Sequence, residues 1–546
     1  MTQQPVQHLF RHLKDDFSAG IVVFLVALPL CLGVALASGA PLFAGLIAGM
    51  VGGLVVSWLS GSQLNVSGPA AGLTVIVFNA IETLGSFQGF LVAVVLAGIM
   101  QLIAGFLKAG VIGAFFPSAV IKGMLAAIGL ILIIKQIPHA TGYSVLYGGP
   151  EAYREEDVHE LLLPIFDAFN SISHGVIIIS TVALLILIIW ERPWFKNQKF
   201  FKLIPGPLIA VIWGVLYNLG AERWAPDWAV SAAHLVSVPV SNNASEFLNN
   251  FSFPDYSYWI NPQVYIIAAT LAIIGSLETL LSLEAVDKLD PLKRTAPTNR
   301  ELKAQGVGNI ISGLIGGLPI TSVIVRSAAN INAGGKTPLS SFIHGLCILL
   351  SVMFFVNYIN YVPLGCLAAI LLHTGFKLAK PALFMDFYRK GWNQLLPFVI
   401  TISSILATDL LKGMLIGLVI GLFFVIKANY RAAITMTRDG SSYILMLNKD
   451  VAFLNKALLR KLLSLVEPNS TLTIDASKSQ FIDHDIVETI DDFLVTAPSH
   501  NISVEVYDLY GKEILRKHEE FVILKDHYDK SPSGKKILIK NKIVGL

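Results

Sequence analysis

Two charged residues lie inside long apolar stretches, and they are the residues of this chain best placed to do chemistry. Glu278 lies in the apolar segment 273–282, and Arg326 lies in the Gly-rich segment 316–327. A charge at membrane depth is costly, so it marks a functional site by default. Ser282 follows Glu278 by four residues and shares its helix face. We expect Glu278 and Ser282 to bind a coupling ion, either H⁺ or Na⁺, and Arg326 to balance an anion's charge.

Simpler roles for both charges stay open. Arg326 is followed closely by Asn330 and Lys336, so its side chain could instead extend to the cytoplasmic surface. Glu278 could form a structural ion pair with Arg326 and take no part in coupling. The sequence does not choose between proton and sodium.

Two short segments, near 69–81 and 320–333, each begin close to a proline and small residues. Proline is favoured in the first turn of a helix, where its missing N–H costs nothing. The first-turn N–H groups of a helix lack intrahelical partners and carry partial positive charge. Two such ends facing each other inside a bundle would form an anion site. The alternative is that the prolines only kink membrane-spanning helices.

Composition sets the frame for these residues. The chain has 546 residues, of which 54% are hydrophobic and 14% charged. The charged share is about 10% in residues 1–430 and about 28% in residues 431–546, where a soluble protein has about 25%. We therefore expect a polytopic membrane domain over 1–430 and a soluble domain over 431–546. A soluble enzyme is excluded, and a net charge of +3 gives no reason to expect a nucleic-acid partner.

The apolar segments suggest fourteen membrane segments in two sets of seven. Twelve have the length of about 20 residues that a full crossing needs, and the two short segments are each third in their set. Sets of seven must insert in opposite orientations, which predicts an inverted repeat of the kind found in secondary transporters. The predicted full-length segments are 17–38, 41–59, 86–107, 112–135, 172–191, 203–219, 262–283, 300–316, 338–357, 360–376, 394–409 and 411–428.

Basic residues orient these segments. With a cytoplasmic N-terminus, the outer connections hold only Arg154, Arg223 and Lys412, although two of these connections are long. This asymmetry follows the positive-inside rule. We expect an integral membrane protein of a bacterial inner membrane with both termini in the cytoplasm.

Several motifs together resemble the SulP family of sulfate permease-type anion transporters. They are Ala27-Leu28-Pro29, Ser67-Gly68-Pro69, the run from Gly317 to Ser327, and Gly334-Gly335-Lys336-Thr337. The resemblance implies a uracil-permease-like seven-plus-seven fold, with a core of spans 1–4 and 8–11 and a gate of spans 5–7 and 12–14. It also implies a substrate site between the third and tenth helices and a homodimer.

The resemblance assigns site residues one by one. Glu278 and Ser282 match acidic and hydroxyl positions of span eight, where sodium-coupled bicarbonate members bind Na⁺ and proton-coupled members use a carboxylate. Many animal members have serine before the arginine, whereas this chain has Val325, so the anion would depend more on backbone N–H groups. The residues that would line the anion are Ser67, Gly68, Pro69, Ala70, Ala71, Thr321, Ser322, Val323, Ile324, Val325 and Arg326.

The segment after about residue 440 has short strands alternating with amphipathic helices, which predicts a small α/β domain. Strands are expected at 442–447, 471–475 and 502–507, and helices at 453–466 and 484–496. The order resembles a STAS domain, the usual C-terminal part of SulP proteins. His484 and Asp485 stand where bacterial anti-sigma antagonists offer a phosphorylatable serine, so we expect a docking or dimer-supporting role. A basic stretch near 530–542 is expected to be solvated, with lipid headgroup contact as the alternative.

These observations predict an ion-coupled secondary transporter of small anions, bicarbonate or sulfate first, working by an elevator-like movement. A dicarboxylate transporter of the same fold is one alternative, and an anion channel or regulatory scaffold is another; a channel has no need of a carboxylate such as Glu278. The chain has no phosphate-binding G-x-x-x-x-G-K-[ST] loop and no nucleophile–base pair. We expect no cofactor apart from Na⁺ as coupling ion. The expected partners are the anion, membrane lipid, a second copy and a cytoplasmic protein bound by the STAS domain.

Overall fold

The structure is a computed structural model of the chain, and it falls into two compact units, residues 1–419 and 420–546. It describes residues 12–111, 117–142, 173–192, 194, 204–240, 243–408, 410–509, 512–517 and 521–526. The predicted domain boundary at 430 and the division by contacts both fall within one helix, α22 (Leu410–Ala433). The basic stretch 530–542, the start of the segment 112–135 and Arg154 lie outside the described residues.

The first unit is helical, and each of the fourteen predicted segments contains a helix in the part of the chain that the structure describes. The elements of the first repeat are α2 (Leu13–Ala37), α3 (Leu42–Val51), a π-helical turn (Gly52–Val56), α4 (Ser57–Leu59), β1 (Ser67–Pro69), α5 (Thr74–Leu84), α6 (Phe87–Phe106), α7 (Ser118–Thr141), α9 (His174–Trp190) and α12 (Gly206–Trp224). A short helix, α13 (Ala244–Asn249), lies between the repeats.

The second repeat has the same order of long and short elements. Its elements are α14 (Pro262–Leu289), α15 (Thr298–Leu314), β2 (Ile320–Ser322), α16 (Ile324–Asn332), α17 (Leu339–Phe354), α18 (Val356–Ile359), α19 (Leu364–Leu378), α20 (Pro381–Arg389), α21 (Trp392–Ala407) and α22. In the described part, six stretches are long and apolar enough to cross a membrane: Leu13–Ala37, Leu42–Leu59, Phe87–Phe106, Ser118–Thr141, Pro262–Leu289 and Leu364–Arg389. The predicted polytopic helical fold with a short third segment in each half is confirmed.

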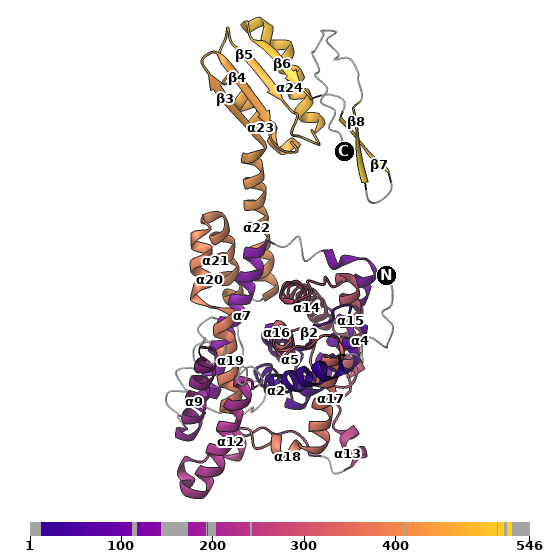
Figure 1. Ribbon diagram of the computed structural model, residues 1–546, viewed down its shortest axis with the longest axis vertical. Coiled ribbons are helices and arrows are strands. Elements are labelled where there is room, and N and C mark those ends of the chain that lie inside the picture. The colour runs from indigo at the N-terminus through magenta and orange to yellow at the C-terminus, as the bar shows by residue number, and fades with distance from the viewer. Residues whose placement is uncertain are drawn as a thin grey trace. The chain divides into compact units, whose positions relative to one another are not determined.

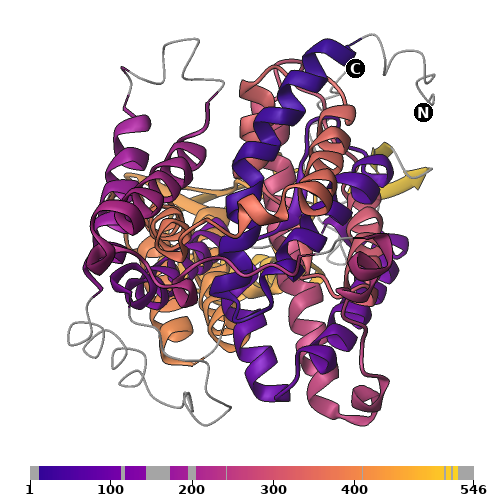
Figure 2. The ribbon, with the colours of Figure 1, turned by 90° about the horizontal axis from the view of Figure 1, so that it is seen from below.

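The helices of this unit form two groups, which lie on opposite sides of it in Figure 1 and can also be followed in Figure 2. In the first group, α6 packs on α14 and α15, and α17 packs on α2. In the second, α7 packs on α19 and α21, and α9 packs on α12 and α19. The first group contains the helices of predicted spans 1–4 and 8–11. Both short helices, α5 and α16, belong to it.

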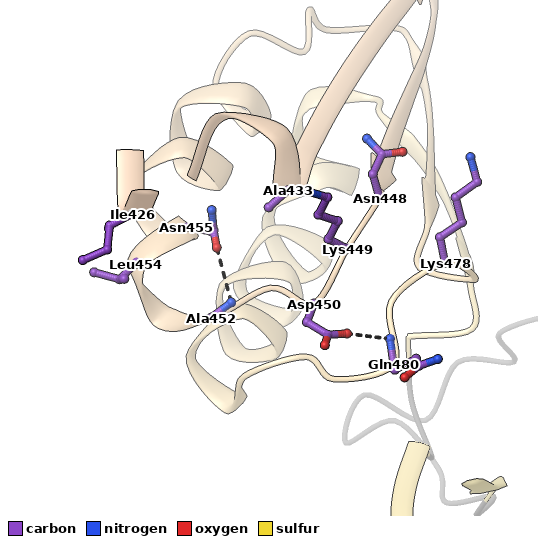
Figure 3. A pocket seen from close by; sticks show the side chains of 10 residues that line it. All are labelled: Ile426, Ala433, Asn448, Lys449, Asp450, Ala452, Leu454, Asn455, Lys478 and Gln480. Carbon is purple, nitrogen blue, oxygen red and sulfur yellow. Dashed lines mark hydrogen bonds between the residues drawn. The ribbon is translucent and has the colours of Figure 1, made fainter. Parts of the chain in front are cut away.

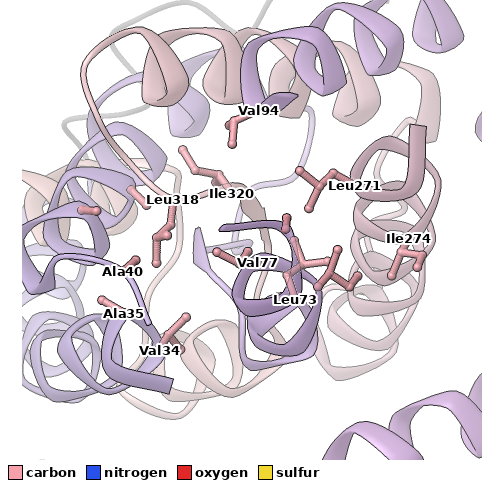
Figure 4. Close-up of a cluster of buried hydrophobic side chains, with 14 of the residues drawn as sticks. Val34, Ala35, Ala40, Leu73, Val77, Val94, Leu271, Ile274, Leu318 and Ile320 are labelled. Atoms are coloured by element: carbon pink, nitrogen blue, oxygen red, sulfur yellow. The ribbon is translucent and has the colours of Figure 1, made fainter. Parts of the chain in front are cut away.

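The two short helices meet at a two-stranded antiparallel pair, with Ser67 opposite Ser322 and Pro69 opposite Ile320. Apolar side chains surround the pair and α5. In Figure 4, Leu73 of the turn before α5 and Val77 of α5 lie in the same cluster as Leu271 of α14 and Ile320. Burial of these side chains holds α5 inside the helical group at about 25 cal/mol per Å² of apolar surface.

The second unit contains a four-stranded sheet in the order β3-β4-β5-β6, with β3 and β4 antiparallel and the other neighbours parallel. The predicted strands and helices are present, and β3, β7 and β8 were not predicted. His484 is exposed at the first position of α24, as expected. The bounds are β3 (Ile434–Asp439), β4 (Ser442–Leu447), α23 (Lys456–Leu463), β5 (Thr471–Asp475), α24 (His484–Thr496), β6 (Ser503–Tyr507), β7 (Lys512–Lys517) and β8 (Phe521–Asp526).

A pocket of about 580 Å³ opens on this unit beside the last turns of α22, and Figure 3 shows its lining. Exposed Lys449 and Lys478 lie on it, and the Asp450 carboxylate accepts hydrogen bonds from the backbone N–H groups of Gln480 and Phe481 at 2.9 Å each. These bonds join two loops at the same end of the sheet.

Asp16 ties the start of α2 to the Gly334–Thr337 loop that was singled out in the sequence. Its fully buried carboxylate accepts hydrogen bonds from the N–H groups of Lys336 (2.7 Å) and Thr337 (3.0 Å) and from the Thr337 hydroxyl (2.6 Å). Through these three hydrogen bonds, Asp16 joins the first helix of one repeat to the loop before α17.

Replacing Asp16 with alanine is expected to lower the thermal midpoint of the membrane unit, because three buried donors lose their acceptor. The cost should be about 3 kcal/mol. Neighbouring Asp15 is exposed, so Asp15→Ala serves as the control and should leave the midpoint unchanged. Equal thermal midpoints for the two variants in detergent would contradict a stabilising role of the hydrogen bonds between Asp16 and the Gly334–Thr337 loop.

Candidate functional site

The centre of the candidate site is the N-terminus of α16. The N–H of Val323, the residue before the helix, donates to the Val66 carbonyl at 3.0 Å, which continues the β1–β2 pairing. No described residue accepts a hydrogen bond from the N–H groups of Ile324, Val325 or Arg326. The side chains of Ile324 and Val325 are 40% and 41% exposed. The end of α16 therefore presents free backbone donors and partial positive charge at an accessible surface.

Arg326 lies directly behind this end and is fully buried. Its Nη2 donates to the Pro69 carbonyl at 3.3 Å, while Nε and Nη1 have no hydrogen-bond partner. Buried His344 lies close to it, and neither ring nitrogen of His344 has a partner. A Cβ on Gly68 would overlap Nη1, so a side chain there would displace the guanidinium. The side chain does not extend to the surface, and its guanidinium also lies at the buried Cys31 thiol.

Glu278 of α14 reaches the other short helix. The Gly72 N–H, in the turn that opens α5, donates to the Glu278 carboxylate, and a Cβ on Gly72 would overlap that carboxylate. The Oε2 atom of Glu278 is buried without a hydrogen-bond partner. Ser282 is buried on the same helix, while Thr279 accepts from the Ser322 N–H at 3.3 Å and links α14 to β2. Thus the Glu278 carboxylate occupies the N-terminus of α5, whereas the N-terminus of α16 has no side chain bound to its free N–H groups.

The two intramembrane charges are not paired with each other. Among the described residues, no ion pair joins Glu278 to Arg326, and each contacts the β1–α5 segment on its own. The same residues contain no cluster of His, Cys, Asp and Glu suited to a metal ion.

A polar stripe on α15 holds the strand pair, and the sequence analysis did not identify it. Its members are spaced four, four and three residues apart, so they lie on one helix face. That regular spacing of polar side chains along a predicted membrane segment was the signal that could have revealed it. The stripe consists of Glu301, Gln305, Asn309 and Ser312, all buried.

Each member of the stripe contacts the segments that lead into the short helices. Gln305 Nε2 donates to Ser67 Oγ at 2.7 Å. The Asn309 side chain forms two hydrogen bonds with the backbone of Ile320: it donates to the carbonyl at 3.1 Å and accepts from the N–H at 2.6 Å. Ser312 Oγ donates to the Leu318 carbonyl at 2.7 Å. Because these bonds are buried, they fix both strands against α15.

The structure brings the eleven predicted anion-lining residues together at the β1–β2 pair, and their side chains differ in role. The hydroxyls of Ser67 and Ser322 form hydrogen bonds in the interior. The surface is formed by exposed Ile324 and Val325, with partly exposed Val323 and Ala71. The buried members are Ser67, Gly68, Pro69, Ala70, Thr321, Ser322 and Arg326.

The chain matches the Sulfate permease family over residues 13–401. It is 28% identical over 415 residues to YvdB of Bacillus subtilis, provisionally named a sulfate transporter, covering 76% of this chain and 74% of that one. It is 27% identical over 374 residues to the bicarbonate transporter BicA of Picosynechococcus, covering 67% of this chain and 62% of BicA.

Two solved structures share its fold. The transmembrane domain of a cyanobacterial BicA aligns with a TM-score of 0.62 at 23% identity, covering 76% of this chain and 98% of that domain. The murine anion transporter Slc26a9 in its inward-facing state aligns with a TM-score of 0.73 at 16% identity, covering 93% of this chain and 90% of that one.

Glycine at 68 is expected to be essential for anion binding, because Gly68→Ala forces the Arg326 guanidinium away from the strand pair. Anion binding can be followed as the rise in thermal midpoint on adding sulfate or bicarbonate, which ligand linkage predicts. That rise should vanish in Gly68→Ala. The control is Gly220→Ala in α12, where an added Cβ makes ordinary contacts only. An undiminished rise in Gly68→Ala would contradict this placement of Arg326.

Proposed function

We propose that this protein, which belongs to the sulfate permease family, is a secondary active transporter that moves bicarbonate or sulfate across a membrane. The family consists of transporters and not of enzymes, and the relatives include a bicarbonate transporter and sulfate transporters. The substrate assignment rests on those names together with the chemistry of the site.

The observation that carries the proposal is the open N-terminus of α16 in front of Arg326. Free N–H groups of a first helical turn bind oxyanions through several short hydrogen bonds. The two unpartnered nitrogens of Arg326 add a full positive charge inside a region of low dielectric constant, where its field is strong. Neutral surface side chains at Ile324 and Val325 leave room for a small anion and offer no side-chain specificity.

Glu278 supplies a means of coupling. Its carboxylate lies at the Gly72 N–H, so its negative charge partly cancels the positive field that an incoming anion would meet. A proton or a sodium ion on the free oxygen, with Ser282 as a second oxygen for sodium, removes that cancellation. Binding of the cation then favours binding of the anion, and by linkage the anion favours the cation to the same degree. Na⁺ and H⁺ both satisfy this argument.

We propose an elevator-like movement of the first helical group against the second. The contact between them is apolar and smooth: Ala37 and Ala71 pack with Leu132 of α7 and Leu371 of α19. Lys135 Nζ of α7 also crosses it and lies 3.7 Å from the centre of the Phe78 ring on α5. Apolar side chains can slide past one another without breaking directional bonds, which suits repeated movement.

The remaining assignments follow from the family and the fold. The protein would be a homodimer in a bacterial inner membrane, with both termini in the cytoplasm as the basic residues predict. The α/β unit after α22 would be a STAS domain that docks to a cytoplasmic partner or supports the dimer. Its sheet of one antiparallel and two parallel pairings is compatible with that role.

Uptake into proteoliposomes tests the transport proposal. Labelled sulfate, bicarbonate and succinate are offered to the full chain with and without a Na⁺ or pH gradient. We expect accumulation of bicarbonate or sulfate that depends on one gradient. Equal flux under every gradient would contradict coupled transport, and uptake of succinate alone would replace the substrate with a dicarboxylate.

Glu278→Gln should abolish gradient-driven accumulation while anion binding survives, because the amide keeps the shape of the side chain but takes up neither proton nor sodium. Glu284→Gln is the matched control, since Glu284 lies on the same helix, is exposed and is paired with Lys288. Undiminished accumulation in Glu278→Gln would remove Glu278 from the coupling role.

A further inference from the structure

We infer that Glu301, a buried carboxylate at the start of α15, is the positioning residue that sets the geometry of the anion site. This inference rests on the proposed function and adds to it a residue that touches neither anion nor coupling ion. Glu301 is fully buried. Its carboxylate accepts hydrogen bonds from three neutral side chains, those of Ser60, Asn65 and Gln305, and the charge of the neighbouring Arg300 also acts on it.

Hydrogen bonds link Glu301 to β1 through Gln305 and to β2 and α16 through Asn65, and we call these two sets the first and second arms of the arrangement. Glu301 Oε1 accepts from Gln305 Nε2 at 2.9 Å, and the same Gln305 nitrogen donates to Ser67 Oγ at 2.7 Å. With both of its hydrogens used, the Gln305 amide has one orientation. That orientation holds Ser67, and so the strand that leads into α5, at a fixed distance from α15.

The second arm runs to β2 and α16. Asn65 Nδ2 donates to Glu301 Oε1 at 2.8 Å, which turns the Asn65 oxygen toward the second repeat. There it accepts from the Ser322 hydroxyl. The Ser327 hydroxyl lies 3.2 Å from the same oxygen and shares its hydrogen with the Val323 carbonyl at 2.9 Å. Ser327 in turn accepts from the Val66 N–H at 2.9 Å. Asn65 therefore joins the loop before β1 to the first turn of α16.

Glu301 also fastens the loop that carries Asn65. Its Oε2 accepts from the Ser60 hydroxyl, and Ser60 Oγ accepts from the Ser62 N–H at 3.1 Å. The adjacent Arg300 donates to the Leu59 carbonyl at 2.9 Å, so α15 holds both ends of the segment 59–65. One carboxylate thus fixes both short helices, and losing it should loosen the site without removing any group that binds the anion.

The test compares Glu301→Ala, Glu301→Gln and Asp16→Ala in the full chain. Glu301→Gln retains an acceptor oxygen for both arms, and its amide can donate to Ser60. Asp16 is the control for stability alone, because it too is a fully buried carboxylate with three donors but lies outside the arrangement. The readouts are the KM and maximal rate of anion uptake and the anion-induced thermal shift.

We expect Glu301→Ala to raise KM about tenfold or more, since both arms lose the oxygen that accepts their hydrogen bonds. Glu301→Gln should stay within about threefold of the parent, and Asp16→Ala should lose thermal stability with KM unchanged. If Glu301→Ala does not insert, Gln305→Met removes the first arm only and should also raise KM.

An unchanged KM in Glu301→Ala, or in Gln305→Met if that variant stands in for it, would overturn the inference. So would an equal rise in KM in Asp16→Ala, because that would make the effect one of stability. A Glu301→Gln variant as impaired as Glu301→Ala would show that the charge itself acts, and would also overturn it. A parent protein that takes up no anion contradicts the proposed function alone, since the thermal shift still tests Glu301.

Discussion

The site depends on one constraint: backbone N–H groups that have no intrahelical partner must be kept inside a membrane domain without collapsing onto protein acceptors. An isolated short helix could not hold its end there, because an unmet buried donor is costly. The antiparallel pairing of Ser67–Pro69 with Ile320–Ser322 solves this by joining the two short helices through their preceding strands. The buried polar side chains of the α15 stripe hold this strand pair in place by hydrogen bonds.

The charges near the pair have separate tasks because they are kept apart. Arg326 supports the open end of α16, Glu278 occupies the end of α5, and Glu301 orients the neutral amides between them. If Glu278 paired with Arg326, neither charge would remain for an anion or a cation. The two glycines that allow this separation, Gly68 and Gly72, leave no room for a side chain.

Sequence reasoning reached the short helices, Arg326 and Glu278 because each has a local signature: a proline near a helix start, or a charge within an apolar run. It could not show that the Ser67 hydroxyl points into the interior, since this depends on pairing with a strand some 250 residues away. Glu301 was missed because it lies at the start of a segment that reads as a normal cytoplasmic end. Strand β3 was missed because it directly continues the helix α22.

The most direct test of the central claim is to locate the bound anion. Anomalous diffraction from crystals of the full chain grown with selenate or bromide would mark it by its heavy atom. The arrangement predicts a peak at the first turn of α16, within hydrogen-bond distance of the N–H groups of Ile324 to Arg326. Peaks confined to other places, such as the lysine-lined pocket beside α22, would contradict the assignment of the short-helix pair as the anion site.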